Sequence, residues 1–302
     1  MYKKILAAVM VVAIAASVCA CASDPTGETG TAAPSQKHTN STIQNTTTPV
    51  NANVFEETVL VDNNDILFKI TAIENDPIWG YTMKTQIENR SDKDLMFSLN
   101  DVSVNGYMCE PYFAVTVSAG MKANKDISFS TDSFETIGIT HVTDVEFELR
   151  VYDNNNWTAD DILEETFSIY PMGVDAVQEY PRQRQDSDLV LFDNEHCTMV
   201  ITGYEPDSIW GYSANVYLVN KTDDTLMFSV GDASVNGYMC NPYFATTVAP
   251  GKQSITSISW TKNAFEENGI TEVETITLPI RVYEADDWMD DDLVNETFTV
   301  NP

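Results

Sequence analysis

The residues best suited to hold a ligand are aromatic and lie in a short segment that occurs twice. Ile78-Trp79-Gly80-Tyr81 recurs as Ile209-Trp210-Gly211-Tyr212. An exposed tryptophan beside a glycine could stack on a sugar or seat a peptide. However, folds made of two packed sheets commonly bury one tryptophan, and Trp79 begins an expected strand, so we favour a core position for it. The candidate ligand-binding residues are Trp79, Tyr81, Trp157, Trp210, Tyr212 and Trp288, of which Trp157 and Trp288 are expected to be exposed.

Clustered carboxylates form a second group of candidate site residues. Calcium takes six to eight oxygen ligands, and two matching acidic segments offer them. They are not EF-hands, because Trp157 and Thr158 stand where a ligand and the required glycine belong. A solvated acidic loop is therefore the favoured interpretation, with calcium as the alternative. The weak calcium candidates are Asp153, Asp160, Asp161, Asp286, Asp287 and Asp290.

Groups for covalent or acid–base catalysis are hard to place. His38 lies in a polar N-terminal segment, and His141 and His196 are matched by Glu272 and Asp65 in the other copy of the repeat. No Ser-His-Asp or Cys-His arrangement follows from these positions. Pairs such as Asp160-Asp161 could serve glycoside hydrolysis, but acidic pairs arise by chance in a chain this acidic. We expect no enzyme and no cofactor, and an extracellular hydrolase is the remote alternative.

The cysteines are expected to be structural. Cys109 and Cys197 fall on apolar faces of expected strands, which predicts small buried side chains with free thiols. A Cys197–Cys240 disulfide is the alternative, because an exported protein can form one. The first copy has Ile66 in place of Cys197, so the fold does not depend on that bond.

The expected strands and turns around these residues belong to a duplicated unit. Residues 62–171 and 193–302 align without a gap, and 49 of the 110 paired positions are identical. The chain of 302 residues has 46 acidic and 16 basic residues and a formal net charge of −30. The two copies carry 20 and 18 of these acids, so the acidity belongs to the unit. A field of this sign excludes nucleic acid as a partner.

Each copy has the pattern of an antiparallel β-structure. Apolar residues alternate with polar ones, as in Leu95, Phe97 and Leu99, which is typical of strands with one buried face. Asn105-Gly106 and Asn236-Gly237 predict two-residue type I′ hairpins. The patterns predict an all-β chain with two tandem immunoglobulin-like antiparallel sandwiches, at residues 54–171 and 188–302, and a short barrel is the alternative.

Shorter features refine this expectation. Residues 133–139 and 264–270 are each expected to form one helical turn, and residues 172–187 a polar linker that permits relative motion of the copies. Pro279 lies within an expected strand and suggests a sheet edge or a bulge there.

The N-terminus has the features of an export signal. Lys3 and Lys4 precede an apolar run at residues 5–18 that is too short to span a bilayer comfortably. Val18-Cys19-Ala20-Cys21 resembles a bacterial lipobox, which makes Cys21 the expected site of acylation and residues 1–21 the signal peptide. Ordinary cleavage after Ala22 is the alternative. Residues 22–53, rich in Thr and Ser, are expected to be a disordered tether.

A wider resemblance combines these features. The lipobox, the tether and the motifs Trp79-Gly80-Tyr81, Glu88-Asn89, Leu95-Met96-Phe97, Val104–Met108 and Gly138-Ile139-Thr140 resemble uncharacterised bacterial cell-surface lipoproteins with tandem immunoglobulin-like domains. The resemblance implies a fold and a lipid-anchored location that faces outside the cytoplasm, and it implies no catalytic residues. We expect a non-catalytic protein that is attached to the membrane by its lipid and binds an extracellular protein, peptide or glycan. A structural or adhesive stalk, stabilised by calcium at the acidic loops, is the alternative.

Overall fold

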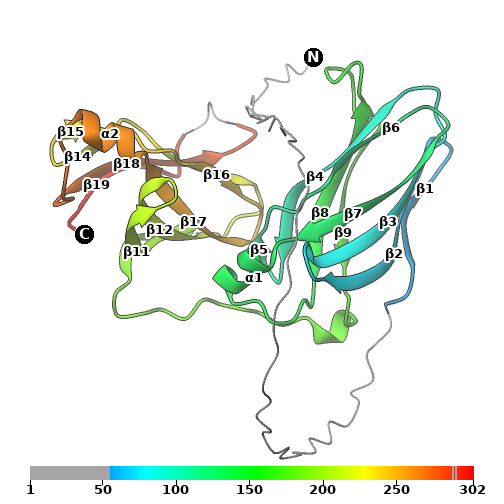
Figure 1. The fold of residues 1–302 in the computed structure, drawn as a ribbon, viewed down its shortest axis with the longest axis horizontal. Helices are drawn as coiled ribbons and strands as arrows, with labels where there is room; N and C mark the ends of the chain where they lie inside the picture. Colours follow the sequence, from blue (N-terminus) through cyan, green and yellow to red (C-terminus); the bar gives the residue numbers. More distant parts are fainter. Residues whose placement is uncertain (1–54, 288, 290) are drawn as a thin grey trace, which may run out of the picture. The chain divides into compact units, whose positions relative to one another are not determined.

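The computed structural model describes residues 55–302 except 288 and 290 (Figure 1). In this part of the chain, each copy of the repeat forms packed antiparallel sheets around its own core, which confirms the all-β sandwich expected from the sequence. The expected signal peptide, the Cys21 acylation site and the tether lie outside the described residues. No helix in the described ranges is long and apolar enough to cross a membrane.

The first copy builds two sheets from nine strands. One sheet contains β1 (Thr58–Asp62), β2 (Ile66–Asp76), β3 (Gly80–Asn89) and β7 (Lys122–Phe129), in this order. The facing strands are β5 (Tyr107–Met108), β4 (Leu95–Val104), β8 (Val145–Asp153) and β9 (Leu163–Ile169), and β6 (Ala114–Val117) also pairs with β4.

The second copy repeats this plan. Its first four-strand group is β10 (Leu189–Asp193), β11 (Cys197–Ser208), β12 (Gly211–Asn220) and β17 (Gln253–Trp260), in this order. Because β17 pairs in parallel with β5, this group belongs to the same nine-stranded sheet as β4, β5, β6, β8 and β9. The other group contains β15 (Tyr238–Met239), β14 (Ser234–Val235), β18 (Ile276–Glu284), β13 (Leu226–Val230) and β16 (Ala245–Val248), and β19 (Val294–Val300) pairs with β18.

Alternation of side chains creates the core of each copy. Along β8, the residues Val145, Phe147, Leu149 and Val151 are fully buried and those between them are not. Phe68 of β2 stacks on Phe97 of β4 with ring centroids 6.3 Å apart, so the two sheets pack face to face. Burial of apolar surface is the main stabilising contribution in such a core.

The Asn-Gly hairpins form as predicted. Asn105 and Gly106 have φ values of 50° and 80°, the two positive angles that a type I′ turn requires. Val104 pairs with Tyr107 across this turn. Asn105 also accepts a hydrogen bond from the backbone N–H of Thr143 at 2.8 Å, which ties the turn to the segment before β8.

The two short helices agree closely with the expected helical turns. α1 (Thr131–Ile137) begins after Ser130, whose side chain accepts a hydrogen bond from the Ser133 N–H. It ends at Gly138, which has a left-handed φ of 82°. α2 (Lys262–Glu267) begins after Thr261 in the same way.

Of the two expectations for Pro279, a sheet edge is wrong, whereas an irregularity in the strand pairing is found. β18 pairs with β19 on one side and with β13 and β14 on the other. Pro279 lies where this neighbour is interrupted, and its carbonyl accepts a hydrogen bond from the Gly231 N–H at 2.8 Å. The break between β13 and β14 removes the need for a proline N–H, so an inner strand tolerates the residue.

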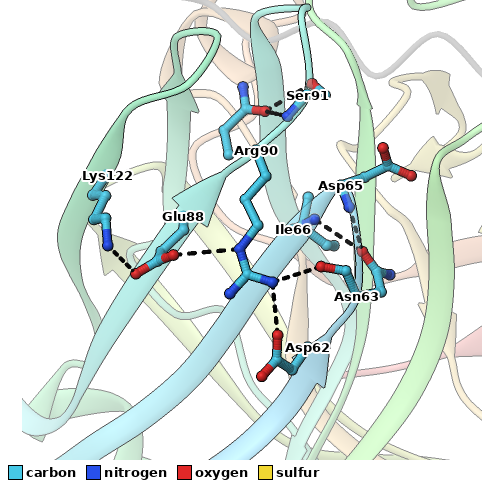
Figure 2. Close-up of polar contacts among 9 residues, drawn as sticks. Asp62, Asn63, Asp65, Ile66, Glu88, Arg90, Ser91 and Lys122 are labelled. Atoms are coloured by element: carbon cyan, nitrogen blue, oxygen red, sulfur yellow. Dashed lines mark hydrogen bonds and ion pairs between the residues drawn. The ribbon is translucent and has the colours of Figure 1, made fainter.

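A polar cluster ties two turns together at one end of the first copy (Figure 2). The Arg90 guanidinium donates to the Asp62 carboxylate at 2.7 Å and to the Asn63 carbonyl at 2.6 Å. It also contacts Glu88, which pairs with Lys122. In the second copy, Lys221 makes the matching contacts with Asp193 and Asn194, each at 2.6 Å. The shared contacts therefore serve the architecture.

The linker contains one 3-10 turn, η1 (Val174–Ala176), and a strong ion pair. Both terminal nitrogens of Arg182 donate to Asp188, at 2.6 and 2.7 Å. The Arg182 guanidinium holds the pKa of the Asp188 carboxyl below its usual value. This end of the linker is therefore tied to the start of the second copy, and relative motion of the copies stays a prediction.

Candidate functional site

The tip of the β2–β3 hairpin carries two exposed apolar side chains. Oδ1 of Asp76 accepts hydrogen bonds from the backbone N–H groups of Ile78 and Trp79, at 2.8 and 2.9 Å, which fixes the turn. Ile78 is 83% exposed and Trp79 is 54% exposed. The bonds from Trp79 and Ile78 lower the pKa of Asp76, so its carboxylate stays charged.

Gly80 lets the chain pass from the exposed tip into the sheet. Its φ is 77°, and a Cβ at this position would lie 2.3 Å from the carbonyl oxygen of Phe129. Only glycine allows this approach without displacing backbone atoms. The next side chain, Tyr81, turns inward and packs against Phe129 and Phe134 with centroid distances of 6.3 and 5.9 Å.

Tyr112 completes the exposed surface. Its backbone N–H donates to the carbonyl of Ser128 in β7 at 2.8 Å, which anchors a loop residue against the sheet. Its side chain is 60% exposed, and its ring lies 6.0 Å from that of Trp79 at an interplanar angle of 70°. Such edge-to-face pairs are a favoured aromatic geometry. We call Ile78, Trp79 and Tyr112 the first aromatic tip.

The second copy exposes the same three residue types with different local bonds. Ile209, Trp210 and Tyr243, the second aromatic tip, are 92%, 69% and 73% exposed. Ser208 replaces Pro77, and its hydroxyl accepts a hydrogen bond from the Trp210 N–H at 3.3 Å. Gly211 has a φ of 118°, and its Cβ would lie 2.3 Å from the carbonyl oxygen of Trp260. Two copies with different turn residues thus keep the same exposed groups.

The structure corrects the interpretation of Trp79 as a core residue. Among the described residues, the buried tryptophan is Trp260, whose Nε1 donates to the Cys240 carbonyl at 2.8 Å, and the first copy has Phe129 at that position. Trp79 lies in a turn at the end of the strand pattern, where alternation no longer determines which way a side chain faces.

The other aromatic candidates fall in different surroundings. Tyr212 is buried against Trp260 and Tyr81 is half-buried, so the two tyrosines lie behind the tips. Trp157 is exposed as expected, and Trp288 lies outside the described residues. Sequence reasoning missed Tyr112 and Tyr243, although both copies keep a Pro-Tyr-Phe segment there.

The acidic loops do not gather their carboxylates. Asp161 is held by two nitrogens of Arg150, at 3.0 and 3.1 Å, and Asp153 pairs with Lys93 at 3.4 Å. Asp286 and Asp287 are exposed, as is Asp160, and Asp290 lies outside the described residues. Among the residues that the structure describes, no group of three histidine, cysteine or acidic side chains is placed to hold a metal ion.

The cysteines in the described ranges are free and buried, as predicted. Burial raises the pKa of the Cys109 thiol to about 12 and that of Cys197 to about 11. A thiol that keeps its proton is a poor nucleophile, so these side chains pack as small apolar groups.

The described histidines have ordinary neighbours. Nδ1 of His141 lies 3.0 Å from the hydroxyl of Thr140, and Nε2 of His196 lies 3.5 Å from the Glu195 carboxylate. Both side chains are exposed or partly exposed, and neither of these contacts is a nucleophile–base pair of the triad type.

Comparison with known proteins gives no family. No protein-family model matches the chain, and no curated protein sequence matches it. Among solved structures, the YadV chaperone is 10% identical over 79% of this chain and 100% of its own, with a TM-score of 0.22. Red sea bream transglutaminase is 11% identical over 76% of this chain and 30% of its own, with a TM-score of 0.19. At such TM-scores neither likeness supports an inference.

Proposed function

We propose that this chain is a non-catalytic, lipid-anchored surface protein of a bacterium, whose duplicated domains bind an extracellular ligand through the two aromatic tips. The observation that carries the proposal is the repeated exposure of Trp79 and Trp210 at matching hairpin ends. Large apolar side chains that remain exposed in a cluster mark binding surfaces. Their presence in both copies favours a shared use over chance.

The chemistry of the tips favours a neutral or basic ligand. Tryptophan and tyrosine rings stack on the apolar faces of sugars and on peptide side chains. Asp76 lies beside the first tip with its carboxylate charged, and the chain as a whole carries −30. Polyanions are repelled by such a surface, so we expect a neutral glycan or a neutral to basic peptide.

Array binding tests the proposal. Two labelled proteins, both without residues 1–21, would be applied to glycan and peptide arrays. One has the parent sequence and the other is the double variant Trp79→Ala, Trp210→Ala. We expect the strongest signals to fall at least tenfold in this variant, because stacking on each ring contributes roughly 1 to 2 kcal/mol. Trp157→Ala removes an exposed tryptophan outside the tips and should leave the signals unchanged. Equal binding by the double variant would overturn the proposal.

The lipid anchor has its own test. Mass spectrometry of the N-terminal peptide from a bacterial host should find an acylated Cys21, and Cys21→Ala should release the protein from the membrane fraction. An unmodified N-terminal peptide would remove the anchor and leave the binding proposal intact.

A further inference from the structure

A cavity of about 780 Å³ lies beside the first aromatic tip and is distinct from it. It opens between the β2–β3 hairpin end, α1 and the segment that follows α1. Its walls include Ile73, Tyr81, Phe134 and Val142, whereas Trp79 does not line it. The volume is in the range of pockets that bind small organic molecules. We call it the Tyr81 cavity.

The apolar wall of the cavity contains one unsatisfied polar atom. The Tyr81 hydroxyl is buried and has no hydrogen-bond partner among the described residues. Burial raises the pKa of this phenol, so the hydroxyl stays neutral. The hydroxyl is closed off from solvent, so Tyr81 offers a ligand its ring rather than a hydrogen bond.

The charged groups of the cavity are mostly acidic. Asp76 and Glu135 line it together with His141, and no lysine or arginine is among its described lining residues. Asp76 is fixed by the two backbone bonds of the hairpin, and Glu135 is exposed on α1. An apolar interior with two carboxylates fits an amphiphilic cation better than an anion.

The second copy fills the corresponding space with a side chain. Tyr204 stands at the position of Ile73, and its ring lies 6.2 Å from that of Tyr212, the counterpart of Tyr81. Tyr204 packs against the core of the second copy, although its hydroxyl also has no partner there. His141 is replaced by Glu272 and Phe55 by Asp186. The two copies therefore differ at this site while their aromatic tips agree.

We propose that the Tyr81 cavity is a binding site, present in the first copy only, for a small organic amine with an apolar body. The apolar body occupies the space over Tyr81 that Tyr204 takes up in the second copy. The ammonium group lies toward Asp76 and Glu135. This site is separate from the ligand binding proposed for the tips, and it does not depend on that binding.

Three matched probes test the charge requirement. Phenethylamine, 2-phenylethanol and phenylacetate share a phenyl ring and differ in charge. The experiment is saturation-transfer NMR on the protein that lacks residues 1–21. We expect phenethylamine to bind with a dissociation constant on the order of 1 mM, as is usual for so small a ligand. The alcohol should bind at least about fivefold more weakly, and the anion should show no saturable binding. Equal binding of amine and alcohol, or no binding of any probe, would overturn the proposal.

Two variants locate the site. Ile73→Tyr copies the second repeat into the first and should abolish amine binding, whereas Val59→Tyr adds the same ring at an exposed position and should preserve it. If Ile73→Tyr does not fold, the double variant Asp76→Asn, Glu135→Gln tests the site instead.

This double variant keeps the hydrogen-bond acceptor of the turn. It should lower the affinity for phenethylamine about fivefold or more and leave the affinity for 2-phenylethanol unchanged. Unchanged amine affinity in the folded variants would contradict the site. The double variant Trp79→Ala, Trp210→Ala should bind the amine as the parent protein does. A failure of the cavity proposal can therefore be distinguished from a failure of the proposal that the tips bind a ligand.

Discussion

At the scale of single residues, Gly80 and Gly211 decide which aromatic side chains reach solvent. Each has a positive φ and a Cβ position 2.3 Å from a backbone oxygen of the adjacent strand. The residue before each glycine is an exposed tryptophan, and the residue after it is a tyrosine that packs inward. The sequence showed that Trp-Gly-Tyr was shared, but strand alternation could not give the direction of a side chain within a turn.

Alanine at Gly80 should therefore destabilise the first copy. The new Cβ conflicts with the Phe129 carbonyl and adds backbone strain, for a loss of about 2 kcal/mol or more in the free energy of unfolding. Gly120→Ala is the control, because Gly120 also has a positive φ but has no atom within 4 Å of its Cβ position. It should cost about 1 kcal/mol. Urea unfolding measures the free energy of unfolding of both variants. An equal loss in the two variants would contradict the conflict between a Cβ at position 80 and the Phe129 carbonyl.

The buried thiols predict the direction of an alkaline pH dependence. The pKa values of Cys109 and Cys197 are raised to about 12 and about 11 from an ordinary 9.0. A raised pKa means that the folded chain holds these protons more tightly than the unfolded chain. The stabilisation is complete below pH 9 and is lost as the pH rises toward the folded values.

Urea unfolding between pH 8 and pH 10.5 should show a falling free energy of unfolding. Replacing Cys109 and Cys197 by alanine should make that slope shallower, even though the variant is less stable at every pH. A slope that is unchanged in the double variant would show that these thiols do not contribute.

At the scale of elements, one buried asparagine in each copy holds a turn against a strand that is distant in the sequence. Nδ2 of Asn89 donates to the carbonyls of Lys93 and Val117, both at 2.7 Å, and its Oδ1 accepts from the Ser91 N–H at 3.0 Å. Asn220 makes the matching bonds in the second copy. The sequence identified the shared Asn as part of a motif, but its partners are 4 and 28 residues away and could not be read from local pattern.

Asn89→Ala and Asn220→Ala should each cost about 2 to 4 kcal/mol, because each leaves several buried backbone groups unpaired. Thermal or urea unfolding monitors the loss. Asn155→Ala changes an exposed asparagine in the acidic loop and should stay within about 0.5 kcal/mol of the parent protein. If Asn89→Ala lowered the free energy of unfolding by a similarly small amount, the hydrogen bonds of the Asn89 side chain would not be needed for stability.

The acidic loop should not depend on calcium. Asp161 is bound to Arg150 and Asp153 to Lys93, so two candidate ligands are already neutralised. We expect the unfolding midpoint to shift by less than about 1 °C between millimolar calcium and excess chelator, with magnesium at equal ionic strength as the reference. If calcium raised the unfolding midpoint and magnesium did not, the result would support the alternative of a stalk stabilised by calcium.

At the scale of the whole molecule, duplication explains most of what the sequence could predict. Residues shared by both copies mark strands, Asn-Gly hairpins and cores, and these follow from local patterns. The tips depend on where a turn places its side chains in three dimensions, and Tyr112 joins Trp79 only through the pairing of its backbone with β7. The Tyr81 cavity depends on a difference between the copies, because Tyr204 packs against Tyr212 in the second copy and Ile73 leaves the space open in the first, which no local pattern predicts.

The number of ligands bound per chain tests the two-tip proposal most directly. Isothermal titration would use the strongest array ligand in monovalent form. We predict two equivalent sites in the parent protein, one site of unchanged affinity in Trp79→Ala or in Trp210→Ala, and none in the double variant. A double variant that still binds with parental affinity and stoichiometry would contradict the proposal that the tips are the binding surface.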